Sequence, residues 1–324
     1  MKNRIYLSLK GAAMGVAETI PGVSGGTIAF ITGIYEELIN SIKAFHPSLI
    51  TTFRKDGFGA VWSKINGNFL VFLLGGMIIG LGVGLVAVDY FLTNYPPIVW
   101  AFFFGLIIAS IIFVGKQIKD WKIGTVFIFM IGAAIAYGIS ILPIAQANDN
   151  LIFIFFCGAV AVSALLLPGI SGSFILLILG MYQFILHDTL KDGVLVQRDV
   201  HAMIIMATFG LGMIVGLALF SRVLSWALRN HHNFTLALLA GFMLGALNKL
   251  WPWRIPTVVM DEAGQVHDFI TGMSIDKIIK EVNVLPAQYV EQLGEPSFVV
   301  PVIISVIVGF ALVMVLDSKS EVKL

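Results

Sequence analysis

Blocks of about 20 mostly apolar residues recur along the chain, and each is long enough to cross the hydrocarbon core of a bilayer. Of the 324 residues, 58% are hydrophobic and only 12% are charged, and most charges lie between these blocks. Lys and Arg nearly balance Asp and Glu, 20 against 19, so the net charge does not indicate a nucleic-acid partner. The chain is therefore predicted to be an all-α polytopic membrane protein in contact with membrane lipids.

The sequence gives little support for metal or disulfide chemistry. Cys157 is a single cysteine and has no partner within the chain. The six histidines are scattered and show no metal-ligand spacing. We expect no metal and no cofactor.

Two stretches of the chain repeat one another. Residues 21–35, PGVSGGTIAFITGIY, align without gaps to residues 168–182, PGISGSFILLILGMY, at a shift of 147 positions. Further on, GMIIGL at 76–81 matches GMIVGL at 212–217 at a shift of 136. Chance similarity between apolar segments would not produce two blocks in the same order, each with one constant shift. The chain is predicted to consist of two related halves.

Each half, 1–146 and 147–324, is predicted to contain three ordinary spans within a single membrane domain. These spans lie at about 68–92, 97–115 and 124–143 in the first half and at about 201–222, 234–250 and 297–316 in the second. The motif-bearing segments, at about 8–40 and 151–187, differ from them. Pro21 lacks an amide hydrogen and the nearby glycines weaken a helix, so two half-helices that meet at a break fit better than one straight helix.

If each broken segment folds back as a re-entrant hairpin, each half crosses the membrane three times. The odd number places the second half upside down relative to the first, as in inverted-topology repeats. The distribution of charges agrees with this inverted arrangement, because basic residues should face the cytoplasm. The basic residues that fall on the cytoplasmic side are Lys2, Arg4, Lys10, Lys43, Arg54, Lys55, Lys64, Arg222 and Arg229, together with those of GKQIKDWK at 115–122. The net acidic segment 251–296 falls outside, and the connection with Lys191 and Arg198 fits least well.

The two breaks are predicted to meet and to form an anion site. Unpaired backbone in a membrane must be buried in protein or line a polar cavity. The breaks lie at Pro21, Gly22, Pro168 and Gly169, and the half-helices that follow begin with Ser24, Gly25, Gly26 and Thr27 and with Ser171, Gly172 and Ser173. Free amides, hydroxyls and a helix dipole favour a negatively charged group there. The alternative is that Gly and Ser only permit tight helix packing.

Glu18 distinguishes the halves, because Leu165 takes its place in the second copy. A carboxylate at membrane depth is costly, and burial raises its pKa, which suits a proton carrier. The alternative is that Glu18 ties down the broken backbone by hydrogen bonds. Arg222 and Lys249 lie near span ends, where they either contact an anionic head group or extend to the interface.

The segments KGAAMGVAETIPGVSGGT (10–27), PGISGS (168–173) and LNKLWPW (247–253) resemble the bacterial polyprenyl-phosphate transporters, formerly a membrane family of unknown function. The resemblance covers essentially the whole chain. It implies a transporter in the bacterial cytoplasmic membrane, not an enzyme, that flips undecaprenyl phosphate to the inner leaflet for reuse in cell-envelope synthesis. The carried-over positions are Glu18, Pro21, Gly22, Ser24, Gly25, Gly26, Thr27, Pro168, Gly169, Ser171, Gly172 and Ser173. Gly26 and Thr27 become Ser173 and Phe174 in the second copy, so the breaks need not contribute equally.

The resemblance and the residues together suggest alternating access, with the phosphate held between the hairpin tips and protonation of Glu18 coupling transport to the proton gradient. Two alternatives remain. An intramembrane lipid-diphosphate phosphatase resembles this pattern but has Arg directly after the motif Ser, where Gly25 and Gly172 stand here. A proton-coupled carrier of a small soluble anion would use the same pocket but needs no lateral slot for a lipid tail.

Overall fold

Helices make up most of the chain. The computed structural model describes residues 2–19, 23–142, 145, 147–260, 266–270 and 277–321. The first half contains α1 Lys2–Glu18, α2 Gly25–Ile31, α3 Tyr35–Lys43, α4 Ser48–Lys64, α5 Gly67–Asn94, α6 Pro96–Gln117 and α7 Ile123–Ser140. The second half contains α8 Leu151–Leu166, α9 Gly172–Ile178, α10 Met181–Gln183, the π-helical η1 Phe184–Gln197, α11 Val200–Asn230, α12 His232–Ala246, the 3₁₀ turn η2 Leu247–Leu250, α13 Pro286–Leu293 and α14 Val299–Glu321. Three strands, β1 Arg254–Met260, β2 Val266–Asp268 and β3 Lys277–Asn283, lie between η2 and α13.

The six segments predicted as spans are all helical. Among the described residues, five helices are long and apolar enough to cross a membrane: α5, α6, α7, α11 and α12 continued by η2. The sixth segment corresponds to α14, whose apolar part, Val299–Val315, is shorter. The chain is thus a mostly helical protein with the long apolar helices of a polytopic membrane protein.

Both motif-bearing segments are interrupted where the sequence predicts a break. Helix α1 ends at Glu18 and α2 begins at Gly25, while Pro21 and Gly22 lie outside the described residues. In the second copy α8 ends at Leu166, and the short helix α9 begins at Gly172. A further interruption was not predicted. The chain turns again at Gly33 and at Gly180, with φ of 70° and 71°, where only glycine is unstrained.

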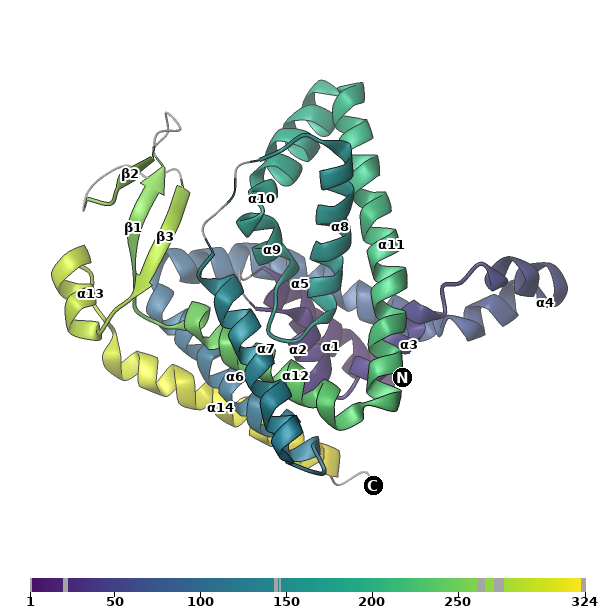
Figure 1. Cartoon of the computed structure of the whole chain (residues 1–324), viewed down its shortest axis with the longest axis horizontal. Helices are drawn as coiled ribbons and strands as arrows, with labels where there is room; N and C mark the ends of the chain where they lie inside the picture. The colour runs from purple at the N-terminus through teal and green to yellow at the C-terminus, as the bar shows by residue number, and fades with distance from the viewer. Residues whose placement is uncertain are drawn as a thin grey trace.

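Glycines bring the first helix of each half close to a long span. Helix α1 packs against α5, and α8 packs against α11 (Figure 1). At several glycines of these pairs an added side chain would collide with the backbone of the partner helix, so the helices approach closely. These contacts include Gly76 with Ser8, Gly80 with Ala12, Gly212 with Phe155 and Gly216 with Ala159. The last two repeat the first two at the shifts found in the sequence, 136 for the glycines and 147 for their partners.

The remaining long helices pair between the two halves. Helix α6 packs against α14, α7 packs against α12, and α6 also contacts α12. Gly105 of α6 lies against the backbone of Val306 in α14, and Gly241 of α12 lies against Phe129 in α7. Because Gly105 and Gly241 are separated by the same shift of 136, matched helices use matched residues to contact the other half.

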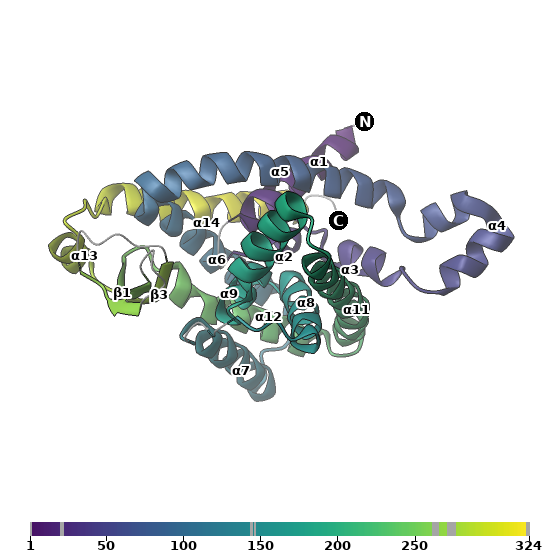
Figure 2. The same cartoon turned by 90° about the horizontal axis from the view of Figure 1, so that it is seen from above.

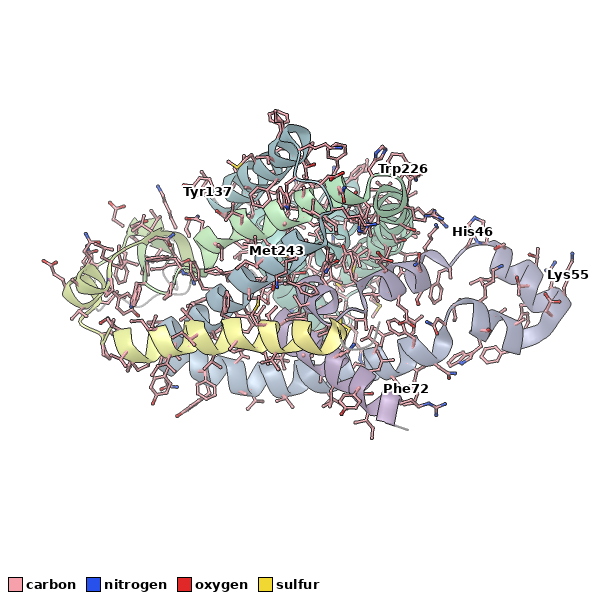
Figure 3. The ribbon with its side chains drawn as sticks, turned by 90° about the horizontal axis from the view of Figure 1, so that it is seen from below. His46, Lys55, Phe72, Tyr137, Trp226 and Met243 are labelled. Atoms are coloured by element: carbon pink, nitrogen blue, oxygen red, sulfur yellow. The ribbon has the colours of Figure 1, made fainter. Side chains whose placement is uncertain are left out.

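The molecule is elongated, with the sheet at one end and α4 at the other (Figures 1 and 2). Helices α5 and α14 follow this long direction, whereas α8 and α11 run across it. Helix α4 buries none of its residues and contains a turn at Gly57, with φ of 77°. Lys55, at its tip, stands far from Met243 in the middle of the molecule (Figure 3). This projection is part of the connection that is longer in the first half.

A small sheet adds to the helical fold that the sequence predicted. Strand β1 pairs antiparallel with both β2 and β3, and Arg254 lies opposite Asn283. Trp253 and Ile255 of this segment are buried with Ala101 of α6 and Val302 of α14. The sheet was not predicted, because its pairing joins residues that lie far apart in the chain, such as Arg254 and Asn283.

Candidate functional site

The first break is held together by Glu18. The amide of Gly25, the first residue of α2, donates a hydrogen bond to Glu18 Oε1 at 2.5 Å. A Cβ atom at Gly25 would lie only 2.7 Å from that oxygen, so the close approach requires glycine. The carboxylate therefore occupies the amide-rich start of α2, where a negative group is favoured.

Ser24 closes the same turn and reaches the second break. Its hydroxyl accepts a hydrogen bond from the amide of Gly26 at 3.0 Å, which is the usual role of a serine before a helix. The hydroxyl also donates to the carbonyl of Leu165 at 3.3 Å. Ser24 is fully buried, so these bonds satisfy a polar group inside the protein.

Two more side chains join the breaks. The amide of Gly169 donates to Thr27 Oγ1 at 3.0 Å, and the Tyr35 hydroxyl donates to the carbonyl of Leu166 at 2.7 Å. Gly169 has φ of 86°, and a Cβ atom there would lie 2.7 Å from the backbone of Met243. The two breaks therefore meet in the protein interior.

The second break differs from the first. The hydroxyls of Ser171 and Ser173 lie 2.8 Å apart, and Ser171 is buried. Among the described residues, neither a side-chain cap nor another acceptor is found for the amides that begin α9 at Gly172 and Ser173. Leu165, the counterpart of Glu18, offers no carboxylate to these amides. The start of α9 is thus the more open of the two.

An apolar pocket of about 450 Å³ ends at the first break. Glu18, Gly25 and Gly26 form its polar part. Its other walls are apolar or aromatic: Met14, Tyr35, Leu38, Ile42, Phe45, Leu70, Leu74, Met77, Val162, Leu165, Leu166, Ile214, Leu217 and Ala218. Leu74 of α5 and Ile214 of α11 are 49% and 67% exposed, so the pocket reaches the outer surface between these two spans.

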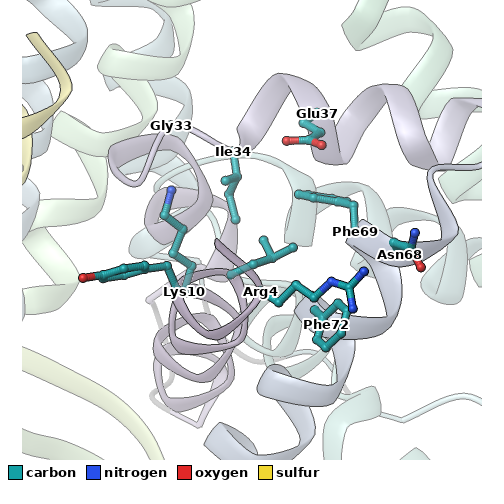
Figure 4. A pocket seen from close by; sticks show the side chains of 10 residues that line it. Arg4, Lys10, Gly33, Ile34, Glu37, Asn68, Phe69 and Phe72 are labelled. Atoms are coloured by element: carbon teal, nitrogen blue, oxygen red, sulfur yellow. The ribbon is translucent and has the colours of Figure 1, made fainter. Parts of the chain in front are cut away.

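A second pocket, of about 390 Å³, lies beside the start of α1 (Figure 4). Lys10 Nζ donates to the carbonyl of Thr32 at 2.6 Å, and the Arg4 guanidinium lies 5.2 Å from the centre of the Phe72 ring. Glu37 faces the same pocket. Its charged groups are therefore engaged with nearby protein groups.

Arg222 and Lys249, the two predicted head-group residues, have different surroundings. The Arg222 side chain donates to the carbonyl of Ala218 in its own helix at 3.0 Å, and no hydrogen bond or ion pair joins it to either break among the described residues. The Lys249 ammonium lies 5.3 Å from the centre of the ring of Phe174, the residue directly after Ser173. Lys249 therefore lies beside the second break.

Sequence reasoning did not identify Tyr35 as part of the site. Its hydroxyl is buried and bonds the other half. A signal was present, since Tyr35 and Tyr182 occupy the same position in the two copies. The described residues include no group of three or more His, Cys, Asp or Glu that could hold a metal ion.

Comparisons with known proteins agree with these motifs. A protein of Vibrio cholerae serotype O1 named polyprenyl-phosphate transporter is 36% identical over 323 residues, which cover 99% of each chain. A Staphylococcus aureus protein of the same name is 31% identical over 291 residues, covering 84% of this chain and 96% of that protein. These names describe transporters, not enzymes. No solved structure matches the chain. Residues 14–267 match the family model described as undecaprenyl phosphate translocase-like, and the chain belongs to this family.

Proposed function

We propose that the chain carries polyprenyl phosphate across the membrane, the substrate named for its relatives. The observation that supports this best is the apolar pocket that opens between α5 and α11 and ends at Glu18, Gly25 and Gly26. A polyprenyl phosphate is a hydrocarbon tail with one charged end. It therefore needs an apolar slot that leads from the lipid to a polar end. Inward transport of undecaprenyl phosphate would return this carrier lipid for reuse.

The phosphate is proposed to bind at the meeting point of the two breaks. The amides of Gly172 and Ser173 and the hydroxyls of Ser171 and Ser173 supply donors at the second break. The first break contributes Ser24, Gly25, Gly26 and Thr27. Donors at helix starts are suited to phosphate oxygens because the dipole and the free amides both favour negative charge.

Glu18 is proposed to control access to this site. Its carboxylate bonds the Gly25 amide, the donor that a phosphate oxygen would otherwise reach. Two negative groups repel each other at short range, so the phosphate would bind more readily when Glu18 carries a proton. Release of that proton on the cytoplasmic side would couple transport to the proton gradient. This would offset the cost of moving an anion against a negative-inside potential.

The two halves are proposed to be inverted repeats, each with a re-entrant hairpin and three spans. The recurring glycine contacts of α1 with α5 and of α8 with α11 support a duplicated unit. Helix α6 pairs with α14, and α7 pairs with α12, so each unit contacts the other through corresponding helices. This also supports two related units. Rocking of the units about the breaks would open the phosphate site to each leaflet in turn.

The orientation is proposed from the charges. The basic connections and both termini are placed on the cytoplasmic side of the bacterial cytoplasmic membrane. The segment that contains the sheet then faces the exterior. This orientation lets lipid from the outer leaflet approach the sheet side of the molecule.

The decisive test is a leaflet-sidedness assay with purified protein in proteoliposomes and fluorescent undecaprenyl phosphate. We expect protein-dependent transfer between leaflets, and a loss of roughly tenfold in rate for Ser173→Val, which removes a phosphate donor. The control is Ser163→Val, because among the described residues the Ser163 hydroxyl donates only to the carbonyl of Ala159 in its own helix. Equal rates with and without protein would refute the proposal.

The same assay separates this proposal from a carrier of a small soluble anion. The 450 Å³ pocket is lined almost entirely by apolar side chains, which favours a tailed substrate. Excess inorganic phosphate or sulfate should therefore leave lipid transfer nearly unchanged. Strong competition by either ion would favour the small-anion carrier.

A further inference from the structure

A third pocket, polar and of about 530 Å³, lies between the sheet, the end of α7 and η2. It is separate from the apolar pocket and shares none of its lining residues. Its polar side chains include those of Ser140, Asn248, Lys249, Arg254, Lys280, Glu281 and Asn283. The last four come from the strands, so this pocket exists only because the sheet folds against the helices.

The pocket carries an excess of positive charge. Lys249, Arg254 and Lys280 line it together with a single carboxylate, Glu281, which leaves a formal charge of +2 on these four residues. One oxygen of that carboxylate forms ion pairs with two cations: Glu281 Oε2 lies 3.1 Å from Lys249 Nζ and 2.9 Å from Arg254 Nη1. Burial alone would raise the pKa of Glu281, but Arg254 and Lys249 outweigh it and hold this pKa below its ordinary value. The carboxylate therefore stays charged and still does not neutralise the pocket.

Arg254 has an unused donor. Its side chain is 8% exposed and its guanidinium lies 4.1 Å from the centre of the Trp100 ring. Its Nε atom is buried and finds no hydrogen-bond partner in the part of the chain that the structure describes. An unpaired buried N–H of a charged group costs folding free energy. A guanidinium that already binds one carboxylate can still form a bidentate contact with a second acceptor such as phosphate.

The pocket adjoins the second break. Ser140 and Lys249 line it and also line a small cavity beside Ser171. The ammonium of Lys249 lies 5.3 Å from the centre of the Phe174 ring in α9. Lys249 thus stands between the sheet and the start of α9, where the amides of Gly172 and Ser173 have no acceptor among the described residues.

We propose that this pocket binds a phosphate monoester group and passes it to the second break by way of Lys249. The excess charge of +2 matches the dianion, and the volume admits one head group. In the empty pocket Glu281 holds Lys249 and Arg254 in place. A bound phosphate replaces Glu281 as the ionic partner of Lys249, and Arg254 and Lys280 contact the phosphate from the sheet side. The passage to the break rests on the proposed transport function, whereas the binding of the anion does not.

The test is a titration of the full chain in detergent, followed by tryptophan fluorescence, since Trp100 stacks on Arg254. The probes are farnesyl phosphate and inorganic phosphate. Lys280→Gln and Lys249→Gln should each weaken binding by about fivefold to tenfold, because each removes one charge-assisted contact. Glu281→Gln should strengthen it, because it removes the resident negative charge. Lys122→Gln is the control, since Lys122 is 79% exposed and pairs with Asp120 elsewhere.

The two probes identify the source of the phosphate. Tighter binding of farnesyl phosphate supports both the site and the passage of a lipid head group through it. Equal binding of both probes supports the anion site but contradicts the passage, because inorganic phosphate would then compete with lipid transfer. Wild-type affinity in both Lys249→Gln and Lys280→Gln would overturn it, and because Lys280 is exposed, Lys280→Gln should fold normally. Failure of the transport proposal looks different, because lipid transfer would be absent while the lysine variants still lose phosphate binding.

Discussion

At the scale of single residues, the exchange of Glu18 for Leu165 makes two similar breaks chemically different. The Glu18 carboxylate accepts a hydrogen bond from the Gly25 amide, and the Ser24 hydroxyl accepts one from the Gly26 amide. The corresponding amides of α9 have no such acceptor among the described residues. The duplicated motif therefore has one closed and one open helix start: Glu18 has no counterpart at Leu165, and the Ser171 hydroxyl bonds Ser173 instead of capping its helix.

Replacement of Glu18 by Gln should remove the pH dependence of lipid transfer. The amide oxygen of Gln still accepts the Gly25 hydrogen bond, so the break keeps its shape, but the side chain no longer changes its charge. The measurement is the transfer rate in proteoliposomes between about pH 5.5 and about pH 8. Glu291→Gln, in the exposed α13, is the control. An unchanged pH profile in Glu18→Gln would exclude Glu18 as the coupling residue.

Acid should weaken the sheet region through Glu281. Its pKa in the folded protein is below the ordinary value of 4.5, so the unfolded chain takes up the proton first as the pH falls. The contribution to the free energy of unfolding is complete above pH 4.5 and is lost as the pH falls through the lower, folded-state pKa.

Thermal unfolding between about pH 6 and about pH 3 measures this effect. The Glu281→Gln variant should be less stable than wild type at pH 6, because Arg254 loses its ionic partner, and should lose less stability on acidification. Parallel pH profiles for the two proteins would contradict the assignment.

At the scale of helices, glycines determine which pairs form. Gly76 and Gly80 of α5 lie against the backbone of α1, whereas at Gly82 of the same helix an added Cβ atom would have nothing within 4 Å. The apolar pattern of α5 is nearly uniform around the helix and does not distinguish these faces. Close backbone contact is therefore what selects the packed face in this apolar segment.

Gly80→Ala should destabilise the protein, whereas Gly82→Ala should not. A methyl group at Gly80 collides with the backbone of Ala12, and such overpacking typically costs about 1–3 kcal/mol. At Gly82 the space is open, and alanine favours helix by up to about 1 kcal/mol. Melting temperatures of the two variants in the same detergent provide the comparison. An equal loss in both would show that α1 and α5 do not pack through Gly80.

At the scale of the whole molecule, α4 and the sheet lie at opposite ends (Figure 2). The charges place the connection that contains α4 in the cytoplasm and the segment that contains the sheet outside. The recurring contacts of the two halves agree with a duplicated unit. The proposed inversion then requires these two ends to face different compartments.

Labelling of single cysteines in intact cells tests this arrangement. In a Cys157→Ser background, a membrane-impermeant maleimide should label Asp268→Cys in intact cells and Lys55→Cys only after permeabilisation. Both positions are exposed, so access depends on the side of the membrane. Labelling of both positions in intact cells would contradict the proposed orientation.

The residues themselves were sufficient to predict the membrane class, the helical segments and the interruptions after Glu18 and Leu166, whereas the two inverted halves stay a prediction. Each of these depends on local properties: apolar length, the missing amide hydrogen of proline and the weak helix preference of glycine. Phosphate binding at Ser24–Thr27 and Ser171–Ser173 stays a prediction. The turns at Gly33 and Gly180 were missed, although their matched positions offered a signal.

Other features depend on contacts between residues far apart in the chain. Tyr35 with Leu166, Thr27 with Gly169 and Arg254 with Glu281 join segments that no local pattern connects. The apolar pocket and the polar pocket beside the sheet are likewise formed by several elements at once. Local chemistry determines where a helix can begin, end or cross a membrane, because those choices involve neighbouring residues. The position of a buried hydroxyl or charge depends on which distant partner satisfies it, and that is decided only when the whole chain packs.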